Sequence, residues 1–152
     1  MMEIDTLDRK ILRELQSDAD QSLEEIGARV GLSRNACWRR IRQLQEAGII
    51  RKRVALLDPD KLGLGLTVFI QLRAAHHRPD WLEFFARTMK DMPEIVGAYR
   101  MTGDLDYLVQ ARVADMADYD RLYRQIIARI ELSDVSASFV MEEIKETTEL
   151  SL

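Results

Sequence analysis

The chain has 152 residues, of which 47% are hydrophobic, and a formal net charge of −4 at pH 7. This composition supports packed cores in one or two small domains and excludes a largely disordered chain. The negative net charge also argues against non-specific binding of polyanions over the whole surface.

No apolar run approaches the roughly 20 residues that cross a bilayer, and Met1 to Arg9 lacks the apolar region of a signal peptide. We therefore expect a cytoplasmic protein with no membrane partner. Cys37 is the single cysteine, which excludes an intramolecular disulfide. A lone thiol on the inner side of a helix is most often a small core residue, and a redox sensor is the alternative.

Three helices are predicted before residue 48. Asp5 can cap the first helix, whose inward stripe comprises Leu7, Ile11, Leu12 and Leu15. Three helices are the minimum that bury the core of a helix-turn-helix unit.

The second and third helices are separated by a four-residue turn. Ser22 and Glu25 have the spacing of a reciprocal capping box, and Gly31 supplies a left-handed stop. Ser33 can cap the next helix, which runs to about Ala47. This arrangement is typical of a helix-turn-helix motif.

The third helix has one apolar and one polar side. Cys37, Ile41 and Leu44 recur at helical spacing and can pack inward. Such a helix can enter a major groove with its outward side. The residues on or near that side are Arg34, Asn35, Trp38, Arg39 and Arg42.

Positive charge is concentrated around this helix. Residues 34–53 contain seven Arg or Lys and one acid, Glu46, a local charge of +6. Gly48 ends the helix, and Ile50–Leu57 is β-branched and aliphatic, which predicts a strand or wing beside the DNA backbone. Three cations open this segment: Arg51, Lys52 and Arg53.

A domain junction is predicted between about 58 and 65. Asp58-Pro59-Asp60 has turn chemistry, and Gly63 and Gly65 follow it closely. We therefore expect a DNA-binding domain over 1–60 and a second domain over 61–152.

The second domain alternates between strand and helix periodicity. The predicted order is β-α-β-β-α-β, which gives a ferredoxin-like antiparallel sheet with both helices on one face, and an α+β chain as a whole. Strands are predicted over 66–73, 95–102, 107–113 and 135–145, with one helix starting at Pro79 and ending near Pro93, and another capped by Asp115.

At this point the chain resembles the Lrp/AsnC family of bacterial and archaeal transcription regulators, over its whole length and in order. The matching segments are Ile4-Asp5, Asp8-Arg9-Lys10-Ile11-Leu12, Val30-Gly31-Leu32-Ser33, Cys37-Trp38-Arg39-Arg40, Leu56-Leu57-Asp58-Pro59 and Gly103-Asp104-Leu105-Asp106-Tyr107. The resemblance implies an N-terminal winged helix-turn-helix, a ferredoxin-like domain for ligand binding and assembly, dimers that commonly associate into octamers, and amino-acid effectors.

Two features refine this resemblance. Arg34-Asn35-Ala36 departs from members that carry a proline shortly before the cysteine, so the preferred DNA sequence stays open. Three segments resemble a subgroup associated with cysteine or other sulfur amino acids: His76-His77, Met92-Pro93-Glu94 and Leu132-Ser133-Asp134-Val135.

The DNA-contacting residues are expected around the start of the third helix and in the cationic segment after it. Arg34, Asn35 and Arg39 can read base edges, since Arg engages guanine and Asn adenine; a solvated polar face is the alternative. Trp38 is either an apolar base or sugar contact or a core residue. The remaining candidates are Ser33 at the cap and, as phosphate partners, Arg40, Arg42, Arg51, Lys52 and Arg53.

The candidate effector site is the Gly103–Asp106 turn. A zwitterion needs backbone donors and an anionic partner, which a Gly-Asp turn beside a strand end offers, although ordinary hairpin chemistry explains the turn equally well. The resemblance locates the pocket here, at a contact between neighbouring dimers, with Thr147 and Thr148 closing it from another subunit; a frayed tail is the alternative for those two. The candidate residues are Tyr99, Met101, Thr102, Gly103, Asp104, Asp106, Thr147 and Thr148.

Other chemistries find little support. His76 and His77 are adjacent and have no metal-ligand spacing to Cys or carboxylates, so we expect neither a metal nor a cofactor. No Ser/His/Asp or Cys/His arrangement and no phosphate loop indicates an enzyme. The leading interpretation is a sequence-specific regulator that responds to cysteine, methionine or leucine, and the alternative is an architectural DNA-wrapping protein without an effector.

Overall fold

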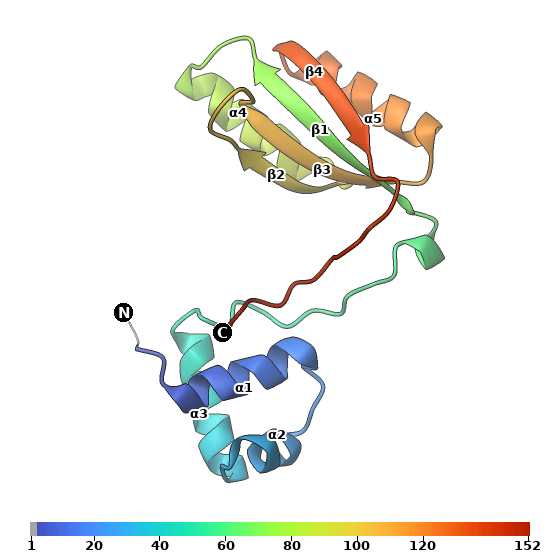
Figure 1. Ribbon diagram of the computed structural model, residues 1–152. Helices are drawn as coiled ribbons and strands as arrows, with labels where there is room; N and C mark the ends of the chain where they lie inside the picture. The colour runs from blue at the N-terminus through green and yellow to red at the C-terminus, as the bar shows by residue number, and fades with distance from the viewer. Residues whose placement is uncertain (1–2) are drawn as a thin grey trace. The chain divides into compact units, whose positions relative to one another are not determined.

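The computed structural model describes residues 3–152, so Met1 and Met2 of the segment considered above lie outside it. The chain forms two compact units (Figure 1). One comprises the chain up to Leu56 together with Lys145–Leu152, and the other is Leu57–Ile144. The sequence-based boundary assigned the whole of 61–152 to the second domain, whereas the structure groups the last eight residues with the first unit.

The N-terminal unit contains the three predicted helices, α1 (Thr6–Ser17), α2 (Leu23–Val30) and α3 (Arg34–Glu46). All three predicted caps are confirmed: the side chain of Asp5 caps α1, that of Ser22 caps α2 and that of Ser33 caps α3. Gly31 has φ 77°, the left-handed conformation expected at the end of α2. The helix boundaries therefore follow from local chemistry.

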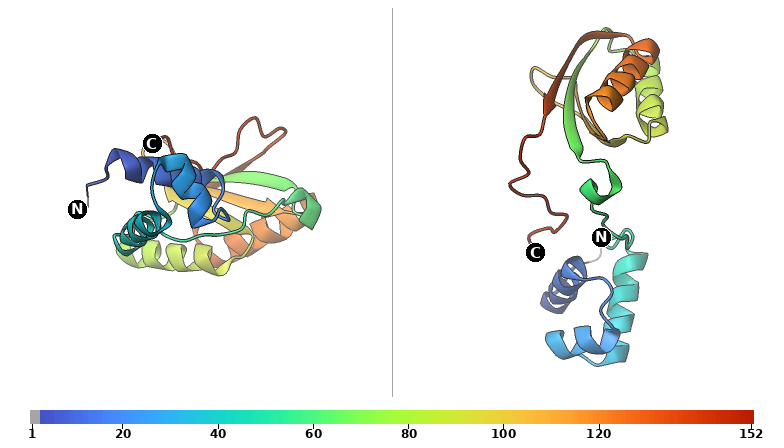
Figure 2. Two further views of the ribbon diagram at one scale, coloured as in Figure 1. Left: turned by 90° about the horizontal axis from the view of Figure 1, so that it is seen from below. Right: turned by 90° about the vertical axis from the view of Figure 1, so that its right-hand side faces the viewer.

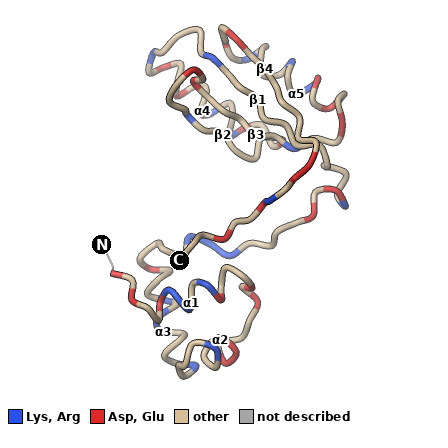
Figure 3. Tube along the Cα trace, viewed as in Figure 1, with Lys and Arg blue, Asp and Glu red and all other residues tan. Residues whose placement is uncertain are grey.

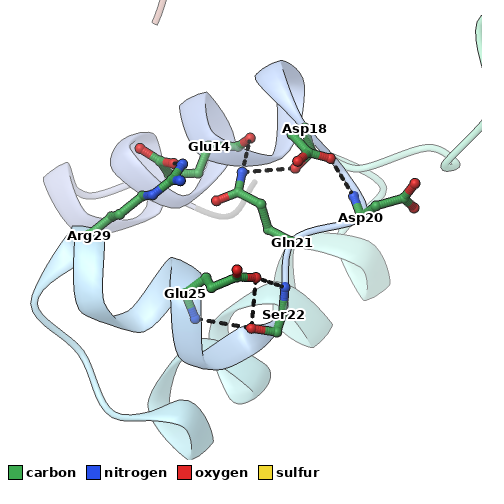
Figure 4. Close-up of polar contacts among 7 residues, drawn as sticks. All are labelled: Glu14, Asp18, Asp20, Gln21, Ser22, Glu25 and Arg29. Carbon is green, nitrogen blue, oxygen red and sulfur yellow. Dashed lines mark hydrogen bonds and ion pairs between the residues drawn. The ribbon is translucent and has the colours of Figure 1, made fainter.

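Figure 4 shows the start of α2, where the capping box has formed. The Ser22 hydroxyl accepts a hydrogen bond from the Glu25 amide at 3.2 Å, and the Glu25 carboxylate accepts one from the Ser22 amide at 2.7 Å. On the side facing α1, Arg29 forms an ion pair with Glu14 at 2.8 Å, and Gln21 donates to the Glu14 carbonyl. These contacts join α2 to α1.

The core of this unit is formed by the predicted apolar helix faces, except for Leu7, which is not part of it. Ile11, Cys37 and Leu44 are fully buried, and Ile26 and Ile41 nearly so. Burial raises the pKa of the Cys37 thiol, which suppresses its reactivity and favours the core role over redox sensing.

The C-terminal unit is a four-stranded sheet in the order β2-β3-β1-β4, with every neighbouring pair antiparallel. Both helices cover one face of it (Figure 2), as the ferredoxin-like prediction requires. Its elements are β1 (Leu66–Ala74), α4 (Pro79–Asp91), β2 (Ile95–Arg100), β3 (Tyr107–Val113), α5 (Met116–Arg129) and β4 (Leu132–Phe139), preceded by a 3-10 turn, η1 (Asp60–Leu62).

Alternation along the central strands separates a buried face from an open one. Val68, Ile70 and Leu72 of β1 are fully buried under the helices together with Val109 and Ala111 of β3. The residues between them, such as Phe69 and Gln71, lie on the opposite face of the sheet. Neither helix covers that face.

Two predicted strands differ from the structure. Within the described residues, the segment Ile50–Leu57 forms no strand, because the single chain offers it no neighbouring strand with which to pair. The last strand was predicted over 135–145 but spans Leu132–Phe139. Phe139 pairs with Val68, and β1 begins only two residues earlier at Leu66, so β4 runs out of partner there.

The capping box gives a first prediction. Replacing Ser22 by Ala should lower the free energy of unfolding by about 1 kcal/mol, since one amide at the start of α2 loses its acceptor. Hydrogen bonds from the Ser22 amide and then its hydroxyl lower the pKa of Glu25. Because the native pKa of Glu25 is lowered, its ionised carboxylate stabilises the fold at pH values above its unfolded pKa. This stabilisation is lost as the pH falls through the native pKa.

The difference between the wild type and the variant should therefore shrink as the pH drops below the unfolded value of 4.5. Urea denaturation at several pH values measures it. A constant difference from pH 7 to the acid limit would contradict the coupling between Ser22 and Glu25.

Candidate DNA-binding and effector sites

Helix α3 presents a polar face opposite its buried stripe. Asn35 and Arg39 are exposed, and neither side chain has a hydrogen-bond or ion-pair partner among residues 3–152. An unpaired Arg and an unpaired Asn on the outside of a helix have donors available for base edges. Both side chains therefore present free hydrogen-bonding groups at the surface of α3, as the predicted base contacts require.

Two other cations of α3 are paired with acids. Arg34 contacts Glu24 of α2 at 2.7 Å, and Arg42 contacts Glu46 at 2.7 Å. All four side chains are more than half exposed, and such surface pairs are worth only a few tenths of a kcal/mol. A phosphate group can therefore displace either acid at little cost.

Trp38 lies on this exposed face. Its side chain is 51% exposed and is absent from the buried core of its unit, which contradicts the core alternative. The guanidinium carbon of Arg42 lies 5.4 Å from the Trp38 ring centre, in cation–π contact. The Trp38 ring therefore packs against Arg42, and about half of the residue is exposed to solvent.

Arg40 has a different environment from its neighbours. Its Nη1 lies 2.7 Å from a carboxylate oxygen of Asp8 and 2.8 Å from one of Asp5. Asp8 is buried, and hydrogen bonds to Asp8 and Asp5 raise the pKa of Arg40. Arg40 therefore joins α3 to the start of α1, and its expected phosphate contact is not supported by this geometry.

The remaining predicted DNA contacts flank α3. The Ser33 hydroxyl accepts a hydrogen bond from the Ala36 amide at 3.2 Å, so it serves the helix cap. Arg51, Lys52 and Arg53 form one of the runs of positive charge drawn in blue in Figure 3. They are exposed and have no ion-pair partner within the described chain. Their charges are available to a polyanion.

The β2–β3 turn is held in place through Asp106. Its carboxylate accepts a hydrogen bond from the Ala74 amide at 2.9 Å, its amide donates to the Leu72 carbonyl, and its carbonyl accepts from Met101. His77 Nε2 lies 4.0 Å from the other carboxylate oxygen. Asp106 is therefore a positioning residue, with one of its two carboxylate oxygens already engaged.

The tip of the same turn is open. Thr102, Gly103 and Asp104 are exposed, and the Asp104 carboxylate has no partner in the part of the chain that the structure describes. Gly103 has φ 99°, a conformation that a residue with a side chain rarely adopts. The turn thus presents a free carboxylate beside exposed backbone.

Tyr99 lies away from this tip. Its hydroxyl would stand 2.8 Å from a Cβ added at Gly97, so the ring lies back over Gly97. Of the predicted effector residues, all of which are described, Tyr99 alone lines a cavity of about 380 Å³ between α4 and β2. Phe85 and Tyr107 also line it, and burial raises the pKa of Tyr107.

Thr147 and Thr148 belong to the N-terminal unit and are exposed. His76 faces Glu131 at 3.6 Å. Among the described residues, no three His, Cys, Asp or Glu side chains are grouped as metal ligands, and no helix is long and apolar enough to cross a membrane.

Comparison with known families finds two matches that together span nearly the whole chain. The Lrp/AsnC ligand binding domain matches residues 67–150, and a winged helix-turn-helix DNA-binding domain matches residues 4–51. The second match lies within the N-terminal unit, and the first lies within the C-terminal unit except for residues 145–150, which the structure groups with the N-terminal unit.

Individual relatives are similar over almost their full length. The chain is 50% identical to the glutamate uptake regulatory protein of Zymomonas mobilis, covering 98% of this chain and 91% of the relative. It is 43% identical to the DNA-binding transcriptional activator DecR of Escherichia coli, covering 98% and 99%. These relatives are regulators of transcription, not enzymes.

Solved structures agree with the fold. The crystal structure of an AsnC family transcriptional regulator from Agrobacterium tumefaciens matches with a TM-score of 0.94 and 50% identity, covering 97% of this chain and 96% of that one. A transcriptional regulator from Neisseria meningitidis, in complex with L-Met, matches with a TM-score of 0.93 and 37% identity, covering 98% and 97%.

The contrast between Arg39 and Arg40 gives a second prediction. Arg40→Ala should lower the free energy of unfolding by about 1–3 kcal/mol, because the buried Asp8 loses its cationic partner. Arg39→Ala removes the same group from the next position but should change stability by no more than about 0.5 kcal/mol.

Thermal or urea denaturation of both variants without DNA measures this difference. Equal stabilities for the two variants would show that the Asp8–Arg40 pair does not hold α1 to α3.

Proposed function

The chain belongs to the Lrp/AsnC family of transcriptional regulators, and from this premise we propose that it binds specific DNA through α3 and responds to a small amino acid. The observation that carries the DNA-binding part is the exposed, partner-free pair Asn35 and Arg39 on the helix that follows the turn. Since the DNA of bacteria and archaea, in which this family of regulators occurs, lies in the cytoplasm, we propose that the protein acts there.

The contacts divide into two classes. Asn35 and Arg39 read base edges in the major groove, while Arg34 and Arg42 leave Glu24 and Glu46 for the phosphates on either side. Arg51, Lys52 and Arg53 add charge from the neighbouring segment. The local excess of cations explains how a chain of net charge −4 binds a polyanion.

Trp38 adds an apolar contact to this polar set. Its open ring stands between base-reading side chains and is backed by Arg42. In a major groove the apolar feature is the C5-methyl group of thymine. We therefore assign Trp38 to a thymine methyl or an adjacent sugar.

The third prediction separates base reading from phosphate binding. Arg39→Ala should cost about 1–3 kcal/mol of operator affinity and relax the sequence preference at one position, because a bidentate base contact is lost. Arg51→Ala should weaken all sequences alike and flatten the salt dependence, because a phosphate contact is lost.

Fluorescence anisotropy titrations with the operator and with scrambled DNA, at several salt concentrations, measure both effects. Unchanged operator affinity in an Arg34/Arg39 double alanine variant would reject α3 as the reading helix.

The effector part of the proposal rests on the β2–β3 turn. A free amino acid carries an ammonium and a carboxylate, and the exposed turn supplies the Asp104 carboxylate for one and main-chain donors at Thr102 and Gly103 for the other. Asp106 holds the turn in place, and we assign the main effector contact to Asp104 instead, since the Ala74 amide already occupies one carboxylate oxygen of Asp106. Cysteine, methionine and leucine are the first candidates, and the Neisseria relative in complex with L-Met supports methionine among them.

Assembly completes the proposed mechanism. We place the dimer contact on the open face of the sheet and propose that dimers associate further into octamers, where Thr147 and Thr148 of another subunit close the effector site. An effector that weakens DNA binding must itself bind more weakly when DNA is present.

The second candidate function is an architectural DNA-wrapping protein without an effector. The observation that favours it is the integration of the β2–β3 turn into the sheet through Asp106, which explains the turn without a ligand. A melting shift with any amino acid decides against it, since a ligand at 100 times its Kd stabilises the native state by about 2.7 kcal/mol.

The fourth prediction concerns Asp104. Asp104→Ala should abolish the amino-acid-induced rise in melting temperature and leave DNA affinity without ligand within about tenfold, or 1.4 kcal/mol. The physical reason is that Asp104 supplies the free carboxylate, which makes no hydrogen bond or ion pair within residues 3–152.

Thermal shift against the twenty amino acids, followed by DNA titration, makes the measurement. Asp91→Ala, which removes an exposed acid at the end of α4, is the matched control and should respond as the wild type does. A variant that binds the same amino acid with unchanged affinity would place the pocket elsewhere.

A further inference from the structure

The outer side of α1 binds the last residues of the chain. The side-chain amide of Gln16 donates to the Leu150 carbonyl at 3.1 Å, and the Leu150 amide donates to Gln16 Oε1 at 2.7 Å. Arg13 donates through both Nε, at 2.8 Å, and Nη2 to the main-chain oxygen of Leu152. The end of the chain accordingly lies beside α1 in Figures 1 and 2.

The Gln16 contact recognises main chain. A carboxamide that donates and accepts at one residue reproduces the pairing that a neighbouring strand would offer. Leu152 adds an apolar contact, since its half-buried side chain packs against the core of the N-terminal unit. The last three residues are therefore held by two polar contacts and one apolar one.

The beginning of the same segment is held by the sheet. The Val140 amide donates to the Thr67 carbonyl at 3.0 Å. The Glu143 carboxylate then accepts hydrogen bonds from the Thr67 hydroxyl at 3.1 Å and from Arg112 at 2.9 Å, at positions on the open face of β1 and β3. Both contacts belong to the C-terminal unit.

Residues 140–152 thus form a segment that is anchored at each end, which we call the strap. Between these anchors, Met141 and Ile144 are almost fully exposed. Because the chain passes between the two units once before β1 and once in the strap, the units are joined by two covalent connections.

We propose that the strap restrains the DNA-binding unit by holding α1, so that both recognition helices of a dimer are presented together to a two-part operator. This inference rests on the proposed DNA-binding function. A reader of two half-sites needs its recognition helices about one DNA turn apart, roughly 34 Å. A unit held by a single flexible linker samples many orientations, which lowers the effective concentration of the second helix at its half-site.

The contact itself is tested first, in the full-length protein without DNA. Gln16→Ala removes both hydrogen bonds to Leu150, so hydrogen–deuterium exchange of the peptide 145–152 should become at least tenfold faster. Ser17→Ala, the matched control on the neighbouring exposed residue of α1, should exchange as the wild type does. If the peptide 145–152 exchanges at the same rate in Gln16→Ala as in the wild type, the proposal that α1 holds the strap is wrong.

The consequence is tested with a Gln16→Ala/Leu152→Ser double variant on two DNA molecules. Affinity for the two-part operator should fall by at least tenfold, while affinity for a single half-site should stay within about twofold. An equal loss on both DNA molecules would overturn the restraint, because the variant would then have damaged the helix-turn-helix itself. Failure of the proposed function has a different signature, a wild type that binds neither DNA molecule.

Discussion

Strand β1 is the element on which the C-terminal unit depends. It pairs with β3 on one side and β4 on the other, and its alternate residues Val68, Ile70 and Leu72 form the centre of the core. Near its end, Leu72 and Ala74 bind Asp106 and so place the β2–β3 turn. Near its start, Thr67 binds the beginning of the strap. Both features of functional interest are therefore attached to a strand that cannot move without breaking the sheet.

In the N-terminal unit, helix periodicity assigns neighbouring residues to opposite tasks. Cys37 and Ile41 are buried, and Arg40, on the flank of that stripe, reaches the buried Asp8. Arg39 is one position away, about 100° around the helix, and has no partner among residues 3–152. The same guanidinium group thus stabilises the unit at one position and, in the proposed function, binds DNA from the next.

The sequence was sufficient where the controlling interactions are local. Capping residues three positions apart and alternating strands yielded the helix starts, the βαββαβ order and most of the core. Pairings between residues far apart in the sequence were missed. Arg40 and Asp8 are separated by 32 residues, as are Asp106 and Ala74, and the separation between Gln16 and Leu150 is 134 residues. Arg40 and Asp106 were therefore assigned to ligands, although the carboxylates of Asp5 and Asp8 engage Arg40 and the Ala74 amide engages Asp106. No periodic signal marks such pairs, because they depend on tertiary placement.

The geometry of β1 also limits how an effector can act. Thr67 and Ala74 are separated by seven residues, roughly 23 Å at about 3.3 Å per residue, so a ligand at the β2–β3 turn cannot touch the strap of its own chain at Thr67. Coupling requires an element with two discrete arrangements, and a central strand paired on both sides has only one. The β2–β3 turn and the strap are both exposed at their middles and can meet another subunit. We therefore expect the response to an amino acid to be carried by contacts between subunits, with the sheet as a rigid frame and the assembly as the part that changes.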